Sequence, residues 1–142
     1  MSEVTSEVRI VVGVDGSTAS VNALQEGAKL AAELGGVVDA VAVWEMPTKH
    51  ASYAALGIGN FEEGARQVLA DALFQAFGDN VPASVSARLI QGSAATGLIS
   101  VAEGARMLVV GRRGHGGLMG LLLGSVSASV VNQSPIPVLV VQ

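Results

Sequence analysis

Cysteine is absent from this 142-residue chain. Without it, neither disulfide bridges nor thiolate metal sites can form. Long hydrophobic runs are also absent, because no apolar stretch approaches the roughly 18 residues needed to cross a bilayer. The first ten residues, MSEVTSEVRI, lack the basic and apolar regions of a secretory signal. We therefore expect a cytoplasmic protein that does not associate with membranes.

Positive charge is scarce. The chain has eight lysine and arginine residues against twelve acids, for a net charge of −4. The basic residues are scattered, and only Arg112 and Arg113 are adjacent. A nucleic-acid-binding protein usually carries a basic stripe, so we expect no nucleic-acid partner.

Hydrophobic residues, in contrast, are abundant. They make up 50% of the chain, and the mean hydropathy is +0.53. No repeat or change in composition divides the sequence, and its length suits one domain over residues 1–142. A chain of this size and hydropathy is expected to contain several strands that are buried on both faces.

Short β-branched runs alternate with segments of helical period. This alternation predicts an α/β fold with a parallel sheet and helices on both faces. The segment 45–60 has no steady period and is interpreted as a loop, either a tolerated insertion or a flap over a ligand. The expected strands are 8–14, 37–44, 83–90, 107–110 and 136–141, and the expected helices are 17–34, 60–77, 92–104 and 125–133.

Two of the expected strands end in unusual residues. The first ends at Asp15-Gly16-Ser17, and the fourth runs into a glycine-rich loop at Gly111. Ligands of parallel α/β sheets bind beyond the carboxyl ends of strands, where the strand order reverses. If these two strands are neighbours there, Asp15 and the glycine loop face one crevice.

The loop GRRGHGGLMGLLLGS contains six glycines between a strand and a helix. Glycine costs conformational entropy, so a glycine excess suggests that the backbone itself contacts a ligand, most often phosphate. The loop has no lysine, which excludes the P-loop pattern. Met119 stands where the dinucleotide pattern needs glycine or alanine, which excludes that pattern too.

The spacing that fits is G-x2-G-x9-G-S, formed by Gly111, Gly114, Gly124 and Ser125. Together with GVDGS at the first strand and an apolar strand after Pro135, this motif resembles the ATP-binding branch of the universal stress protein family. The resemblance covers nearly the whole chain. It implies a Rossmann-like single domain, an open five-strand parallel sheet of order 3-2-1-4-5, and ATP between the first and fourth strands.

The resemblance also implies site residues at strand ends and in the glycine loop. They are Val14, Asp15 and Val43 near the adenine, Gly111, Gly114, Gly124 and Ser125 along the ribose and phosphates, and Val126 and Ser127 for further backbone or hydroxyl contacts. The nucleotide is ATP, or alternatively AMP or a cyclic nucleotide, and Mg²⁺ or Mn²⁺ would be held mostly by the phosphates. A homodimer through the last strand, 136–141, is implied as well. Met107 departs from the family, which often has an acid there, and is interpreted as structural.

Several residues keep a simpler interpretation. Asp15 also suits an Asx turn or a helix cap, and Ser125 suits an N-cap. Arg112 is a candidate for phosphate contact, but it and Arg113 also suit solvated loop charges. His115 suits an exposed loop position.

No nucleophile–base pair and no metal-ligand cluster is visible in the sequence, so we assign no catalytic residue and no protein metal site. The favoured hypothesis is an ATP-binding stress-response protein whose nucleotide state regulates dimerisation or partner choice. One alternative is a slow ATPase or phosphotransfer enzyme that uses His115 or Asp15. The other is an interaction module that holds no nucleotide.

Overall fold

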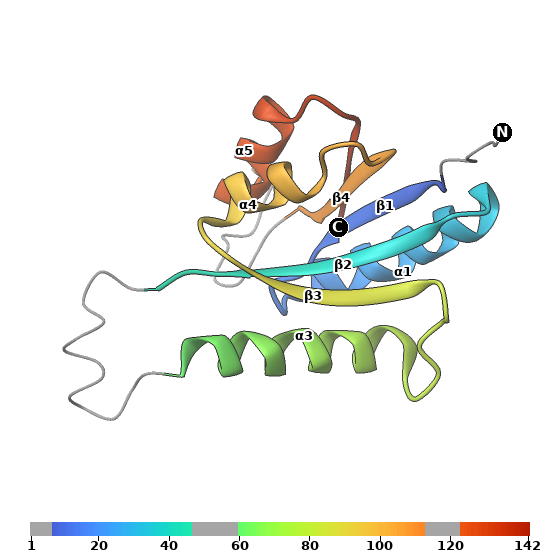
Figure 1. The fold of residues 1–142 in the computed structure, drawn as a ribbon, viewed down its shortest axis with the longest axis horizontal. Helices are drawn as coiled ribbons and strands as arrows, with labels where there is room; N and C mark the ends of the chain where they lie inside the picture. The colour runs from blue at the N-terminus through green and yellow to red at the C-terminus, as the bar shows by residue number, and fades with distance from the viewer. Residues whose placement is uncertain (1–6, 47–59, 113–122) are drawn as a thin grey trace, which may run out of the picture.

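One sheet of five parallel strands organises the computed structural model, which describes residues 7–46, 60–112 and 123–142 (Figure 1). The strands lie in the order β3-β2-β1-β4-β5, which confirms the predicted order and the parallel α/β class. The order reverses at β1, so the switch point lies between β1 and β4. The strands are β1 (Arg9–Gly13), β2 (Val37–Trp44), β3 (Val85–Gln91), β4 (Met107–Gly111) and β5 (Val138–Val141).

Helices cover both faces of the sheet. In Figure 1, α1 and α3 lie on one side of it and α4 and α5 on the other. Within residues 7–46, 60–112 and 123–142, no helix has the length and hydropathy to cross a bilayer. The helices are α1 (Thr18–Leu34), α3 (Phe61–Phe77), α4 (Ala94–Val101) and α5 (Ser125–Gln133).

The predicted helix ends follow from local side-chain chemistry. Ser17 is the N-cap of α1, and its hydroxyl oxygen accepts a hydrogen bond from the Ser20 amide at 3.1 Å. Gly35 ends α1 in the left-handed conformation, with φ of 68°. Asn60 caps α3 by accepting from the Glu63 amide at 3.1 Å. These contacts explain why the expected helices 17–34 and 60–77 agree with the observed α1 and α3 to within one residue.

Several predicted boundaries are wrong by two residues or more, among them the start of the third strand, which is Val85 rather than residue 83. The last strand begins at Val138 rather than residue 136, because Pro137 has no amide hydrogen and Ser134 closes a turn on the Ile136 amide. Helix α4 ends at Val101 rather than near Gly104, which adopts a φ of 82° that a helix does not permit. The predicted loop 45–60 lies almost entirely outside the described residues.

The core consists of two layers, one on each face of the sheet. Ile10 and Val12 of β1 are fully buried against the α1 and α3 layer, whereas Val11 between them is fully buried against the α4 and α5 layer. This alternation explains why the central strands are continuously apolar. Burial of each such side chain contributes about 1.5–3 kcal/mol to folding. Met107 packs partly buried against the first layer, in line with its structural interpretation.

Asp39 is the one charged residue that is buried among the described residues. Its carboxylate accepts hydrogen bonds from Arg88 at 2.8 and 3.2 Å and from Arg9 at 3.2 Å. Arg9 also donates to the carbonyls of Val101 and Glu103 just beyond the end of α4. This cluster joins β1, β2, β3 and α4 near the amino end of β1, so the charge in a central strand has a structural role.

Gly111 lies where the end of β4 packs tightly against the start of α1. A Cβ atom at this position would lie 2.8 Å from the Cβ and carbonyl carbon of Ala19 and 2.9 Å from the Ser20 amide nitrogen. Backbone atoms of a helix cannot move aside locally. Packing alone therefore requires glycine at this position, whatever the residue contacts in a ligand.

We predict that Gly111→Ala lowers the free energy of unfolding by about 1–3 kcal/mol, because the methyl group overpacks this contact. Denaturant titration without added ligand measures the change. The control is Gly64→Ala in α3, where an added Cβ meets no atom within 4 Å. That control should stabilise the protein by about 0.5–1 kcal/mol through helix propensity. Wild-type stability of Gly111→Ala would contradict the contact.

Candidate functional site

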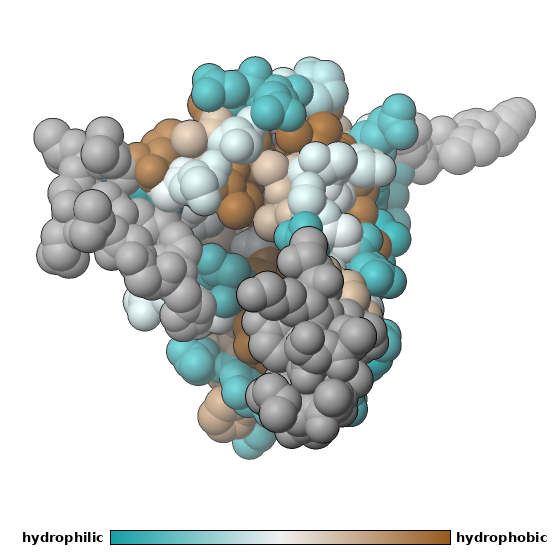
Figure 2. Space-filling view, turned by 90° about the vertical axis from the view of Figure 1, so that its left-hand side faces the viewer, coloured by the Kyte–Doolittle hydropathy of each residue, from teal (hydrophilic) through white to brown (hydrophobic). Residues whose placement is uncertain are grey.

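A cavity of about 420 Å³ opens at the carboxyl ends of the central strands. Figure 2 views this side of the molecule, where apolar residues are visible among more polar ones around a hollow. The cavity lies between the strand ends and the N-terminal turns of α4 and α5. Its lining consists of Gly13, Val14, Asp15, Ser20, Val41, Val43, Ala94, Leu98, Val110, Gly111, Gly124, Ser125, Val126 and Ser127.

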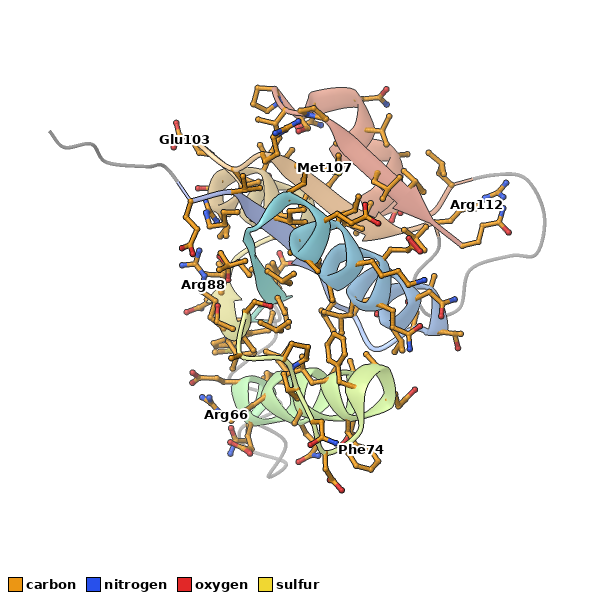
Figure 3. The ribbon with its side chains drawn as sticks, turned by 90° about the vertical axis from the view of Figure 1, so that its right-hand side faces the viewer. Arg66, Phe74, Arg88, Glu103, Met107 and Arg112 are labelled. Carbon is orange, nitrogen blue, oxygen red and sulfur yellow. The ribbon has the colours of Figure 1, made fainter. Side chains whose placement is uncertain are left out.

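Every predicted site residue except Arg112 and Gly114 lines this cavity. Gly114 lies outside the described residues, as do Arg113 and His115. Arg112 follows β4 directly, and Figure 3 shows it where the chain leaves the sheet. Its Nε atom is buried and has no hydrogen-bond partner within the described ranges. The tertiary structure thus gathers Asp15 and the two ends of the glycine loop around one space.

Sequence reasoning missed the apolar wall of the cavity. Ala94 and Leu98 come from α4, and Val41 and Val110 precede the ends of β2 and β4. Leu98 approaches β1 closely, since a Cβ on Gly13 would lie 2.8 Å from its Cδ1 atom. Aliphatic residues of this kind resemble any core residue in a sequence, so only the packing of α4 on the sheet reveals their place.

Asp15 stabilises the local backbone and also lines the cavity. Its Oδ1 atom accepts from the Ser17 amide at 2.9 Å and from the Ser17 hydroxyl at 2.6 Å. This is the Asx turn that the sequence left open. Asp15 is exposed and is among the residues that line the cavity, while its side chain orders the start of α1.

The N-terminus of α5 differs from that of α1. Gly124 is its N-cap and has no side chain to accept a hydrogen bond. The first intrahelical bond runs from the Ala128 amide to the Gly124 carbonyl at 2.9 Å. The amides of Ser125, Val126 and Ser127 therefore precede the helical hydrogen bonds and have no acceptor among the described residues, so they can donate to a ligand in the cavity. The N-cap interpretation of Ser125 is wrong, because Ser125 is already the first helical residue.

Ser127 joins α5 to the sheet. Its side chain is buried, and its hydroxyl donates to the Gly111 carbonyl at 2.5 Å. The base of the glycine loop is closed by two further bonds, from the Gly124 amide to the Arg112 carbonyl at 2.8 Å and from the Arg112 amide to the Val141 carbonyl at 2.6 Å. The hydroxyl of Ser127 thus holds the start of α5 against the end of β4.

The arrangement suits a small anion attached to an apolar group. Free amides at a helix N-terminus favour negative charge, while the valine and leucine side chains offer a flat apolar group a dry surface. The described residues contain no cluster of three or more histidine, cysteine or acidic side chains able to hold a metal ion.

Comparison with known proteins agrees with this architecture. Universal stress protein Rv2005c of Mycobacterium tuberculosis is 35% identical over 152 residues, which cover 99% of this chain and 50% of that protein. The chain spans about half the length of the curated relatives it matches. UspA from Lactobacillus plantarum shares the fold, with a TM-score of 0.77 at 17% identity over 97% of this chain and 100% of that one.

A universal stress protein solved in complex with cAMP is 27% identical, with a TM-score of 0.61 over 97% of this chain and 98% of that chain. The model of the universal stress protein family matches residues 8–142. On this match, which spans nearly the whole chain, the chain belongs to the universal stress protein family.

Proposed function

We propose that the chain binds an adenine nucleotide, ATP in the first instance, in the cavity at the carboxyl ends of β1, β2 and β4. The phosphates contact the Gly124–Ser125 end of the glycine loop, with Gly111, Arg112 and Gly114 beside them. The adenine lies against Val14, Asp15 and Val43. Support comes from the common cavity that most of these residues line and from the cAMP complex of a 27% identical protein.

The observation that carries the proposal is the contrast between two helix N-termini. At α1, the Ser17 hydroxyl already occupies the amide of Ser20. At α5, Gly124 supplies no side-chain cap, and the amides of Ser125, Val126 and Ser127 have no acceptor within residues 7–46, 60–112 and 123–142. A phosphate therefore gains more at α5 than at α1, and the helix dipole there contributes about 0.3–2 kcal/mol according to burial.

The base end of the cavity is apolar. Val14 is buried at 5% exposure and Leu98 likewise at 5%, and both face the same space as Val43. A purine ring inserted there removes these side chains from water, at roughly 25 cal/mol per Å² of apolar surface. Backbone groups at the strand ends then supply the polar contacts that distinguish one base from another.

Binding, rather than rapid hydrolysis, is the activity we assign. Asp15 is the carboxylate of the described lining, and Ser17 engages it through two hydrogen bonds. Phosphoryl transfer needs a positioned base or water and stabilisation of charge. Mg²⁺ or Mn²⁺ would be held mainly by the phosphates and would supply charge neutralisation.

We further propose a cytoplasmic stress-response role in which nucleotide binding regulates dimerisation or partner choice. The dimer forms through β5, at an open edge of the sheet. The bonds from Arg112 to Val141 and from Gly124 to Arg112 connect this strand to the phosphate end of the cavity. Exposed edge strands favour pairing with another chain, and Val131 on neighbouring α5 is 43% exposed.

The site assignment predicts that Gly124→Val weakens ATP and AMP binding by about tenfold or more, because the side chain enters the path of the phosphate. Gly124 has φ of −67° and ψ of 164°, which valine adopts without strain. Isothermal titration calorimetry measures the affinity. Unchanged affinity would contradict the assignment.

Gly124→Ser is the matched variant for this test. A serine N-cap accepts a hydrogen bond from the first-turn amides and so competes with the phosphate for them. We expect an unchanged or raised melting temperature together with weaker nucleotide binding. Mass spectrometry of nucleotide released from the purified wild-type protein identifies the natural ligand, and its absence at every preparation would favour the nucleotide-free interaction module.

The enzyme alternative makes a separate prediction. If His115 served as an acid or base, His115→Ala would lower steady-state phosphate release from ATP by about 100-fold or more. We expect wild type and His115→Ala to release phosphate at equal rates near background. A rate that falls with the substitution would establish an ATPase.

The dimer is tested at β5. The carbonyls of Pro137 and Val141 both face β4, so by alternation the backbone groups of Val138 and Val140 face the open edge. Val140→Pro removes an outward amide without breaking the pairing to β4. Light scattering at micromolar concentration should give about twice the chain mass of 14.3 kDa for wild type and the single mass for the folded variant. A monomeric wild type would contradict the dimer.

A further inference from the structure

Helix α4 carries cavity residues at its start and has no side-chain cap there. Ala94 and Leu98 line the cavity, whereas Ser93, the N-cap residue, makes no capping hydrogen bond through its side chain. The helix has 8 residues, which makes it about 12 Å long. Helices of this length are marginal by themselves and depend on tertiary contacts. The position of this part of the cavity wall therefore depends on what holds α4 against the sheet.

The far end of α4 is held by a side chain from β1. The Arg9 guanidinium donates to the carbonyls of Val101 at 3.1 Å and Glu103 at 3.0 Å. The last turn of α4 contains no basic residue, so Arg9 supplies from another element the positive charge that a helix C-terminus favours. Figure 3 shows Glu103 and Arg112 at opposite ends of the sheet. Arg9 therefore acts at the end of α4 that lies away from the cavity.

The carboxylate of Asp39 holds Arg9 in place. This side chain is 10% exposed and accepts from Arg9 Nη1 at 3.2 Å. Arg88 binds the same carboxylate from β3, and both side-chain hydrogen bonds that it makes within the described residues end on Asp39. The two arginines thus share one partner, and Arg9 is the one of the two whose hydrogen bonds also reach the end of α4.

We propose that Arg9 is a positioning residue for the nucleotide site, which acts by fixing α4 and with it the apolar wall at Ala94 and Leu98. Arg9 itself is not part of the described cavity lining. Leu98 already packs closely on Gly13 of β1, so release of the far end lets α4 move away from the sheet rather than toward it. A wider base end encloses the purine less completely and weakens binding. The inference rests on the proposed function and adds a remote residue to it.

Two substitutions of the same kind test the role of Arg9. Arg9→Gln and Arg88→Gln each remove one guanidinium from the buried Asp39 carboxylate, and Arg9→Gln also removes the bonds to the α4 carbonyls. The backbone bond from the Arg106 amide to the Arg9 carbonyl is retained in both variants. We expect both to melt at a lower temperature than wild type, because the carboxylate loses donors in each.

Nucleotide affinity should separate the two variants. Isothermal titration calorimetry of the full chain with ATP and Mg²⁺, at a temperature where each variant is folded, should give about three- to tenfold weaker binding for Arg9→Gln. Arg88→Gln should stay within about twofold of wild type. Amide hydrogen exchange should be faster in α4 of Arg9→Gln than in α4 of Arg88→Gln, and saturating ATP should restore the protection.

Arg9→Lys is the milder variant, to be used if Arg9→Gln does not fold. Lysine keeps the charge beside Asp39, but its compact ammonium does not span both the carboxylate and the two carbonyls as the guanidinium does. We expect a melting temperature nearer to wild type and about two- to threefold weaker ATP binding.

Wild-type ATP affinity in the folded Arg9 variants would overturn the role of Arg9 and leave the nucleotide site standing. Equal weakening by Arg9→Gln and Arg88→Gln would also overturn it, because the effect would then belong to the charged cluster as a whole. A wild-type chain that binds no adenine nucleotide would overturn the proposed function, and this inference with it.

Discussion

The proposed chemistry depends on the amides at the start of α5, which have no hydrogen-bond acceptor among the described residues. A helix leaves its first amides without partners, and proteins commonly satisfy them with a side chain at the N-cap. In this protein Ser17 does so for α1 and Asn60 for α3, whereas α4 has no side-chain cap and Gly124 leaves α5 without one. The glycine makes the helix less stable by itself and keeps its amides available to a ligand.

Close packing around the cavity holds these amides in place. Gly111 allows the end of β4 to touch the start of α1, and the Ser127 hydroxyl ties α5 to the Gly111 carbonyl. Gly13 similarly allows Leu98 to approach β1. The small residues near the site therefore have two functions, since they bring helices close to the sheet and leave space for a bound molecule.

Strong ionic contacts lie away from the cavity. Arg9, Asp39 and Arg88 join β1 to β3 and to the carbonyls at the end of α4, which anchors the helix that forms the apolar wall. The described cavity lining, in contrast, has one carboxylate and no cation. The sequence alone did not predict this charged cluster, because residues 9, 39 and 88 come together only when β1, β2 and β3 lie side by side.

The sequence by itself determined the elements, the parallel α/β class and, through the G-x2-G-x9-G-S spacing, the family. These features follow from local rules: hydrophobic period, cap chemistry at Ser17 and Asn60, and glycine spacing. Tertiary structure alone decided that the start of α5 lies at the cavity, that Gly111 is required for packing, and that Ala94 and Leu98 of α4 form part of the cavity wall. The reason is physical, because a cavity and a close contact are properties of the space between elements, and residues distant in the chain define that space.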